Sequence, residues 1–114
     1  IHGTGNQTRD FTYVGDTCRG IMLADQNKNA IGNTFNIGQG RETSIITIAK
    51  KMMEKYEQIT GKKINQKLKF VKQRSGDVMR HLADIRYAKK VLGYRPEISF
   101  DEGIKKYMKW KISN

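Results

Sequence analysis

The amino-acid sequence predicts an α/β fold, a small layered domain of about three short strands and four helices. Short segments with apolar residues at every second position alternate with longer segments whose apolar residues recur every three or four positions. The chain has 114 residues, of which 37% are hydrophobic and 29% charged, as in a folded domain. We therefore expect a single domain, residues 1–114. Three strands make a small sheet, so we also expect it to dock against a larger one.

The strands are predicted from alternation and from the turns that bound them. Residues 10–14 alternate like a half-buried strand, residues 34–37 form a second strand that ends at a glycine-rich turn, and residues 67–71 form a third.

The first two helices are predicted from their start and stop signals. Asp16 stands where an N-cap would begin a helix that carries Cys18, Ile21 and Met22 on one face and ends in the polar residues 26–29. Ser44 is the expected N-cap of the longest helix, which ends at Gly61.

The last two helices are shorter. Asp84 is expected to open a helix that ends at Gly93, with a proline beyond it. Ser99 and Glu102 form a capping box for the final helix. Its apolar stripe includes Phe100, Ile104, Tyr107, Met108 and Ile112, and Trp110 nearby is expected in the core.

Composition limits the classes of function. Cys18 is the only cysteine, which excludes an internal disulfide or a thiolate metal cluster and favours a reducing, cytoplasmic setting. No apolar run approaches the roughly 20 residues of a membrane span. The N-terminus has no initiator methionine and no signal-peptide pattern, so we expect residues upstream of Ile1.

The net charge of +11 attracts polyanions but does not identify one. Most of the excess is lysine spread over amphipathic segments, which is typical of solvated helix faces. A small basic nucleic-acid-binding module is the alternative from another class. It would need aromatic residues interleaved in a basic patch, whereas the aromatic residues here occupy positions typical of a core, so we expect no specific nucleic-acid partner.

Two patterns imitate a catalytic or cofactor site. Tyr107 and Lys111 have the Tyr-x-x-x-Lys spacing, but Tyr107 belongs to the apolar stripe of an end helix. Gly38-x-Gly40-x-x-Thr43 follows a predicted strand and opens a helix, yet the third glycine of a dinucleotide-binding turn is absent. The histidines have no partners at metal-ligand spacing. We predict no catalytic, cofactor-binding or metal-binding residue in this chain.

Arg9, Arg74 and Asp77 are the candidate binding residues. Both arginines lie in polar, turn-prone segments, where a guanidinium can hold phosphate oxygens in a bidentate manner. Asp77 follows Arg74 across a glycine, so one loop offers a cation for phosphate and an acceptor for ribose hydroxyls. Arginine and aspartate flanking a turn glycine also commonly form a local ion pair. Spacing leaves both interpretations open.

Five segments together resemble one known arrangement. They are residues 7–14 (Gln-Thr-Arg-Asp-Phe-Thr-Tyr-Val), 35–40 (Phe-Asn-Ile-Gly-x-Gly), 74–78 (Arg-x-Gly-Asp-Val), 83–85 (Ala-Asp-Ile) and 92–96 (Leu-Gly-Tyr-x-Pro). In order and spacing they resemble the C-terminal, substrate-binding part of NAD-dependent nucleotide-sugar epimerases and dehydratases of the extended short-chain dehydrogenase/reductase family. The resemblance covers nearly the whole chain.

The resemblance implies a role for each candidate. Arg9 and Arg74 match arginines that contact the diphosphate of a UDP- or dTDP-hexose, and Asp77 matches an acceptor for the nucleotide ribose. An N-terminal Rossmann domain would bind NAD and supply catalysis, so this chain alone would be inactive. The whole enzyme would oxidise the sugar C4 hydroxyl and then return the hydride, as an epimerase, or eliminate water, as a dehydratase. Asp84 matches a helix start, which implies capping.

The sequence departs from the family pattern at several places. Gly15 stands where an aspartate is frequent, Thr4 where Gly-Asp-Gly is common, and Ser75 where proline is common. The charged residues of the loop remain. The form Arg74-x-Gly76-Asp77-Val78 favours enzymes like UDP-glucose 4-epimerase, and dTDP-glucose 4,6-dehydratase-like enzymes are the alternative.

Overall fold

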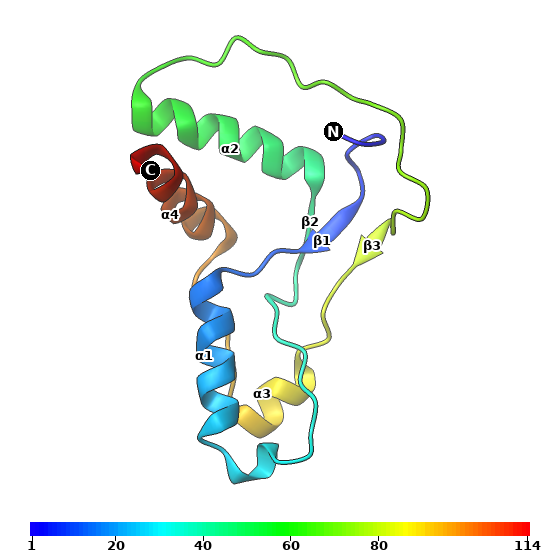
Figure 1. Ribbon diagram of the computed structural model, residues 1–114, viewed down its shortest axis with the longest axis vertical. Coiled ribbons are helices and arrows are strands. Elements are labelled where there is room, and N and C mark those ends of the chain that lie inside the picture. Colours follow the sequence, from blue (N-terminus) through cyan, green and yellow to red (C-terminus); the bar gives the residue numbers. More distant parts are fainter.

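The computed structural model describes residues 1–114 as an elongated molecule of 52 × 35 × 20 Å. Helices α1 (Val14–Asp25) and α3 (Arg86–Leu92) lie at one end, and α2 (Ile45–Thr60) and α4 (Phe100–Ser113) lie at the other (Figure 1). A one-turn 3-10 helix, η1 (Lys28–Ala30), follows α1. Three strands complete the fold, so the predicted α/β class with three short strands and four helices is confirmed.

The strands form one small mixed sheet in the order β2-β1-β3. The central strand β1 (Thr8–Asp10) pairs antiparallel with β2 (Glu42–Ser44) and parallel with β3 (Arg80–His81). Thr8 lies opposite Ser44 on one side and Arg80 on the other. The sheet therefore joins three segments that are far apart in the sequence.

The predicted strand positions are wrong. Residues 11–13 leave the sheet, and the ring of Phe11 packs 6.0 Å from that of Phe100 in α4. Residues 34–37 are extended but unpaired, with Phe35 and Ile37 packed against the core. Residues 67–71 belong to a long connection from α2 to β3, and only Val71 makes an isolated bridge, to His2. In all three segments the apolar side chains pack without a strand partner.

The predicted helix caps are confirmed. The Ser44 hydroxyl accepts a hydrogen bond from Thr47 N at 3.2 Å, and the Ser99 hydroxyl accepts one from Glu102 N at 3.3 Å. Gly61 and Gly93 end α2 and α3 in the left-handed conformation, with φ of 69° and 67°. Asp84 accepts a hydrogen bond from Arg86 N at 3.0 Å, which agrees with the capping role implied for it.

The first helix differs from the prediction. It begins at Val14, and Asp16 lies inside its first turn with a buried side chain instead of capping it. The face that carries Cys18, Ile21 and Met22 points to solvent. The inward face instead carries the carboxylate of Asp16 and Gly20.

The core is small, because only 11 of the 114 residues are buried. Its main cluster consists of Ile85, Ala88, Leu92 and Tyr94. At the other end α2 packs against α4, where Ile104 and Met108 are buried. The prediction of a core position for Trp110 is wrong, since the residue is 60% exposed. No helix combines the length and the apolar character that crossing a membrane requires.

Candidate functional site

Arg9 lies on the central strand and its side chain is held on three sides. Nη1 donates hydrogen bonds to the carbonyl oxygens of Thr8, at 2.7 Å, and Val78, at 2.6 Å. Nη2 donates to Asp77 Oδ1 at 2.6 Å, and both side chains are largely buried. A guanidinium has five N–H groups, so Nε–H and one hydrogen on Nη2 remain for a ligand. Arg9 is therefore fixed in place with part of its binding capacity free.

The loop that follows residue 73 brings the other two candidates to this strand. Gly76 has a φ of +76°, a conformation that favours glycine, and it turns the chain between Arg74 and Asp77. Thr8 N donates to Met79 O at 2.8 Å, which ties the end of the loop to β1. The loop thus reaches Arg9 because β3 pairs with β1.

The structure brings Arg9 and Asp77 together, whereas the local ion pair between Arg74 and Asp77 does not form. Arg74 is exposed, and its side chain makes no hydrogen bond or ion pair. Its loop contact is through the backbone, where Arg74 O accepts from Asp77 N at 3.3 Å. One free guanidinium, one partly free guanidinium and one free carboxylate oxygen therefore lie on adjoining segments.

The glycine turn beside the site is already occupied by a protein carboxylate. Asp10 accepts hydrogen bonds from the backbone N–H groups of Gln39 and Gly40, both at 2.8 Å. A Cβ added at Gly38 would lie 2.7 Å from Asp10 Oδ2, so glycine is needed for the close approach. The turn therefore has an architectural role. Its N–H groups do not fit the phosphates of NAD, and the short sheet has no other dinucleotide-binding turn.

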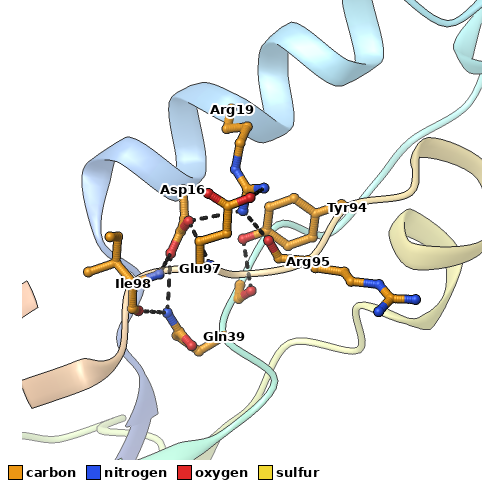
Figure 2. Close-up of polar contacts among 8 residues, drawn as sticks. Asp16, Arg19, Gln39, Tyr94, Arg95, Glu97 and Ile98 are labelled. Carbon is orange, nitrogen blue, oxygen red and sulfur yellow. Dashed lines mark hydrogen bonds and ion pairs between the residues drawn. The ribbon is translucent and has the colours of Figure 1, made fainter. Parts of the chain in front are cut away.

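A buried polar network supports the turn from the opposite side (Figure 2). Asp16 is 2% exposed, and its carboxylate accepts hydrogen bonds from Glu97 N at 3.0 Å and Ile98 N at 3.1 Å. Gln39 Nε2 donates to Asp16 at 3.4 Å and to Ile98 O at 2.6 Å. The network joins α1, the glycine turn and the segment that leads into α4.

Arg19 and Tyr94 complete this network. Arg19 pairs with Asp16 and Glu97 and donates to Arg95 O, as Figure 2 shows. The Tyr94 hydroxyl donates to Gly38 O at 3.0 Å. Burial, and then the charge of Asp16, raises the pKa of Tyr94, so the phenol stays protonated and acts as a donor. Sequence reasoning missed this role of Asp16, although a carboxylate on the polar side of an amphipathic helix was a usable signal.

Tyr107 and Lys111 form no catalytic arrangement in this chain. Tyr107 is 46% exposed and packs beside Trp110, with ring centroids 6.0 Å apart. Both residues line a largely apolar hollow between α2, α4 and residues 11–14. Neither side chain hydrogen-bonds to another group.

Comparison with known proteins matches residues 1–107 to the family described as GDP-mannose 4,6 dehydratase. The chain is 40% identical over its whole length to a putative UDP-glucose 4-epimerase of Methanocaldococcus jannaschii, of which it covers 34%. It is 30% identical over its whole length to dTDP-glucose 4,6-dehydratase 1 of Escherichia coli, of which it covers 32%. The chain thus spans about a third of the length of the curated relatives it matches.

Two solved structures have the same fold at similar sequence identity. UDP-glucose 4-epimerase of Thermotoga maritima, solved with UDP-glucose, has a TM-score of 0.86 and is 32% identical, with 99% of this chain and 34% of that chain covered. UDP-glucuronic acid 4-epimerase of Bacillus cereus, solved with UDP-glucuronic acid and NAD, has a TM-score of 0.77 and is 36% identical, with 97% and 35% covered.

Proposed function

Because this chain belongs to the family described as GDP-mannose 4,6 dehydratase, we propose that it forms the nucleotide-sugar-binding part of an NAD-dependent 4-epimerase that acts on a UDP-hexose. In this proposal Arg9 and Arg74 bind the diphosphate, and Asp77 accepts hydrogen bonds from the ribose. The remainder of the enzyme, a Rossmann domain, supplies NAD and the catalytic groups. The chain itself is the single domain that holds the substrate.

The observation that carries the proposal is the meeting of Arg9 and Asp77 beside the unpaired Arg74. Asp77 orients Arg9 and keeps one carboxylate oxygen free, so the pair can hold phosphate and hydroxyl groups at once. Arg74 loses no protein partner when it turns to a phosphate. The UDP-sugars in the solved relatives from Thermotoga maritima and Bacillus cereus support this ligand class.

A UDP-hexose epimerase is favoured over a dTDP-glucose 4,6-dehydratase for two reasons. The identity to the putative epimerase is 40%, against 30% to the dehydratase. The two solved relatives described above are also epimerases. Titration with UDP-glucose and dTDP-glucose separates the two ligands, and clearly tighter binding of dTDP-glucose would favour the dehydratase.

Arg74→Ala tests the phosphate contact directly. We expect isothermal titration to show roughly tenfold weaker binding of UDP-glucose, because a charge-assisted hydrogen bond contributes about 1.5–3 kcal/mol. Lys72→Ala is the matched control, since Lys72 is an exposed cation two residues away whose side chain makes no hydrogen bond. This control should change the affinity less than about twofold.

The ligand provides a second control. Uridine has no phosphate, so Arg74→Ala should leave its affinity unchanged. Equal losses in the Arg74 and Lys72 variants would show that only net charge matters. Binding of DNA that weakens steeply with salt, with no response to UDP-glucose, would contradict the proposal and favour the nucleic-acid module.

A further inference from the structure

Helix α1 exposes its apolar face and buries its polar one. Val14, Ile21 and Met22 are 65%, 63% and 59% exposed, and Cys18 is exposed as well. Most surface helices have the reverse arrangement, because burying apolar area stabilises the fold. An exposed apolar stripe of this kind is typical of a surface that another protein segment covers.

The rotation of α1 about its axis is fixed, so the helix cannot turn this stripe inward. Asp16 binds the backbone N–H groups of Glu97 and Ile98 on the inner side. Gly20 packs so closely against Ile37 that an added Cβ would lie 2.9 Å from its Cδ1. At 3.6 residues per turn, positions 14, 18, 21 and 22 all lie on the side opposite these contacts.

We propose that the α1 stripe (Val14, Cys18, Ile21 and Met22) is the docking surface for the NAD-binding part of the enzyme. This inference rests on the proposed function. Relatives extend over about three times the length of this chain, so a segment large enough to cover the stripe exists in them. The N–H groups of the glycine turn are bonded to Asp10, so NAD must be held by that other segment.

A second copy of this chain is a less suitable occupant. Each copy carries a net charge of +11, and two such molecules repel each other at low ionic strength. The stripe also begins next to the hollow that Val14, Tyr107 and Trp110 line. The apolar surface therefore continues from α1 towards α4, as expected for a contact with a whole domain.

Cys18 provides a direct probe, since it is the only cysteine and lies within the stripe. The experiment compares its alkylation by a maleimide in the 114-residue chain and in a chimera. In the chimera this chain replaces the matching third of the Methanocaldococcus jannaschii relative. Mass spectrometry of the peptide that holds Cys18 gives the rate whatever other cysteines are present. Cys18→Ser with Gln66→Cys is the control, because Gln66 is exposed in the connection between α2 and β3.

We expect alkylation of Cys18 to be at least about tenfold slower in the chimera, and that of the control cysteine to be unchanged. Equal rates for Cys18 in both proteins would overturn the proposal, and so would slowing at both positions. Protection of Cys18 that grows with the concentration of the isolated chain would assign the stripe to a second copy instead. Binding of UDP-glucose, measured on the same samples, reports the proposed function separately.

Discussion

The Arg9–Asp77 ion pair gives Asp77 two functions at one position. Its Oδ1 orients the guanidinium that we assign to the diphosphate, and its other oxygen is free for the ribose. Arg9 keeps two further hydrogen bonds, to Thr8 O and Val78 O, so it does not depend on Asp77 alone for its position. The two functions of Asp77 are therefore separable by experiment.

Asp77→Asn is expected to weaken UDP-glucose binding roughly fivefold, or about 1 kcal/mol, because an amide accepts weaker hydrogen bonds than a carboxylate. If Asp77 contacts the ribose, the loss should shrink with the 2′,3′-dideoxy form of UDP, which lacks both hydroxyls. Titration of both proteins with UDP and dideoxy-UDP gives the double-mutant cycle. The same loss with both ligands would show that Asp77 acts only through Arg9.

At the scale of single residues, sequence reasoning found charge but could not find partners. Arg9, Arg74 and Asp77 stood out because turns surround them, yet the pairing of Arg9 with Asp77 depends on β3 lying beside β1. Asp16 was interpreted as a local cap, whereas its partners Glu97 and Ile98 are some 80 positions away. Contacts at such a separation leave no local pattern in one sequence.

At the scale of elements, the helices were predictable and the strands were not. Ser44, Gly61, Gly93 and Ser99 mark helix ends through contacts within four residues, so their signals are local. The strands have only two or three residues, and their positions are set by tertiary pairing. The apolar alternation in residues 10–14 and 34–37 reflects packing on helices and core.

The sheet is held together by a polar cluster that crosses all three strands. Glu42 on β2 accepts a hydrogen bond from the Thr8 hydroxyl on β1 at 2.6 Å. It also accepts two from Arg80 on β3, at 3.0 and 2.6 Å. The hydrogen bond from Arg80, followed by that from Thr8, lowers the pKa of Glu42 from 4.5 to about 2. Glu42 therefore links the outer strands through the strand that carries Arg9.

Glu42→Gln should lower the free energy of unfolding in a manner that depends on pH. A carboxylate with a depressed pKa contributes its stabilisation fully above pH 4.5, and this is lost as the pH falls through about 2. The difference from the wild type should thus be largest at neutral pH and shrink across this interval in urea unfolding. Asp25→Asn is the control, because Asp25 is exposed and makes no side-chain hydrogen bond. A difference for Glu42→Gln that stays constant with pH would contradict the assignment.

At the scale of the whole molecule, positive charge is concentrated next to the candidate site. The connection between α2 and β3, residues 61–79, contains six lysines and arginines before its only acidic residue, Asp77. None of these six side chains forms a hydrogen bond or an ion pair, and the connection runs as a long exposed arc to the strand beside Arg9 (Figure 1). Such a field attracts an anionic nucleotide sugar before any direct contact forms.

This field should make UDP-glucose binding sensitive to salt. The Debye length falls from about 10 Å at about 0.1 M salt to about 3 Å at about 1 M, so added NaCl screens distant lysines before direct contacts. We expect the wild type to lose roughly threefold to tenfold in affinity over this range.

Replacing the five lysines of the connection by glutamine should flatten this dependence, with affinities converging at high salt. Those lysines are Lys62, Lys63, Lys67, Lys69 and Lys72. The control replaces an equal number on the rest of the molecule, Lys28, Lys89, Lys90, Lys105 and Lys111, and so changes the net charge equally. If both variants flatten the dependence to the same extent, net charge rather than the placement of the connection steers the ligand. A constant loss at every salt concentration would instead show that the connection contacts the ligand directly.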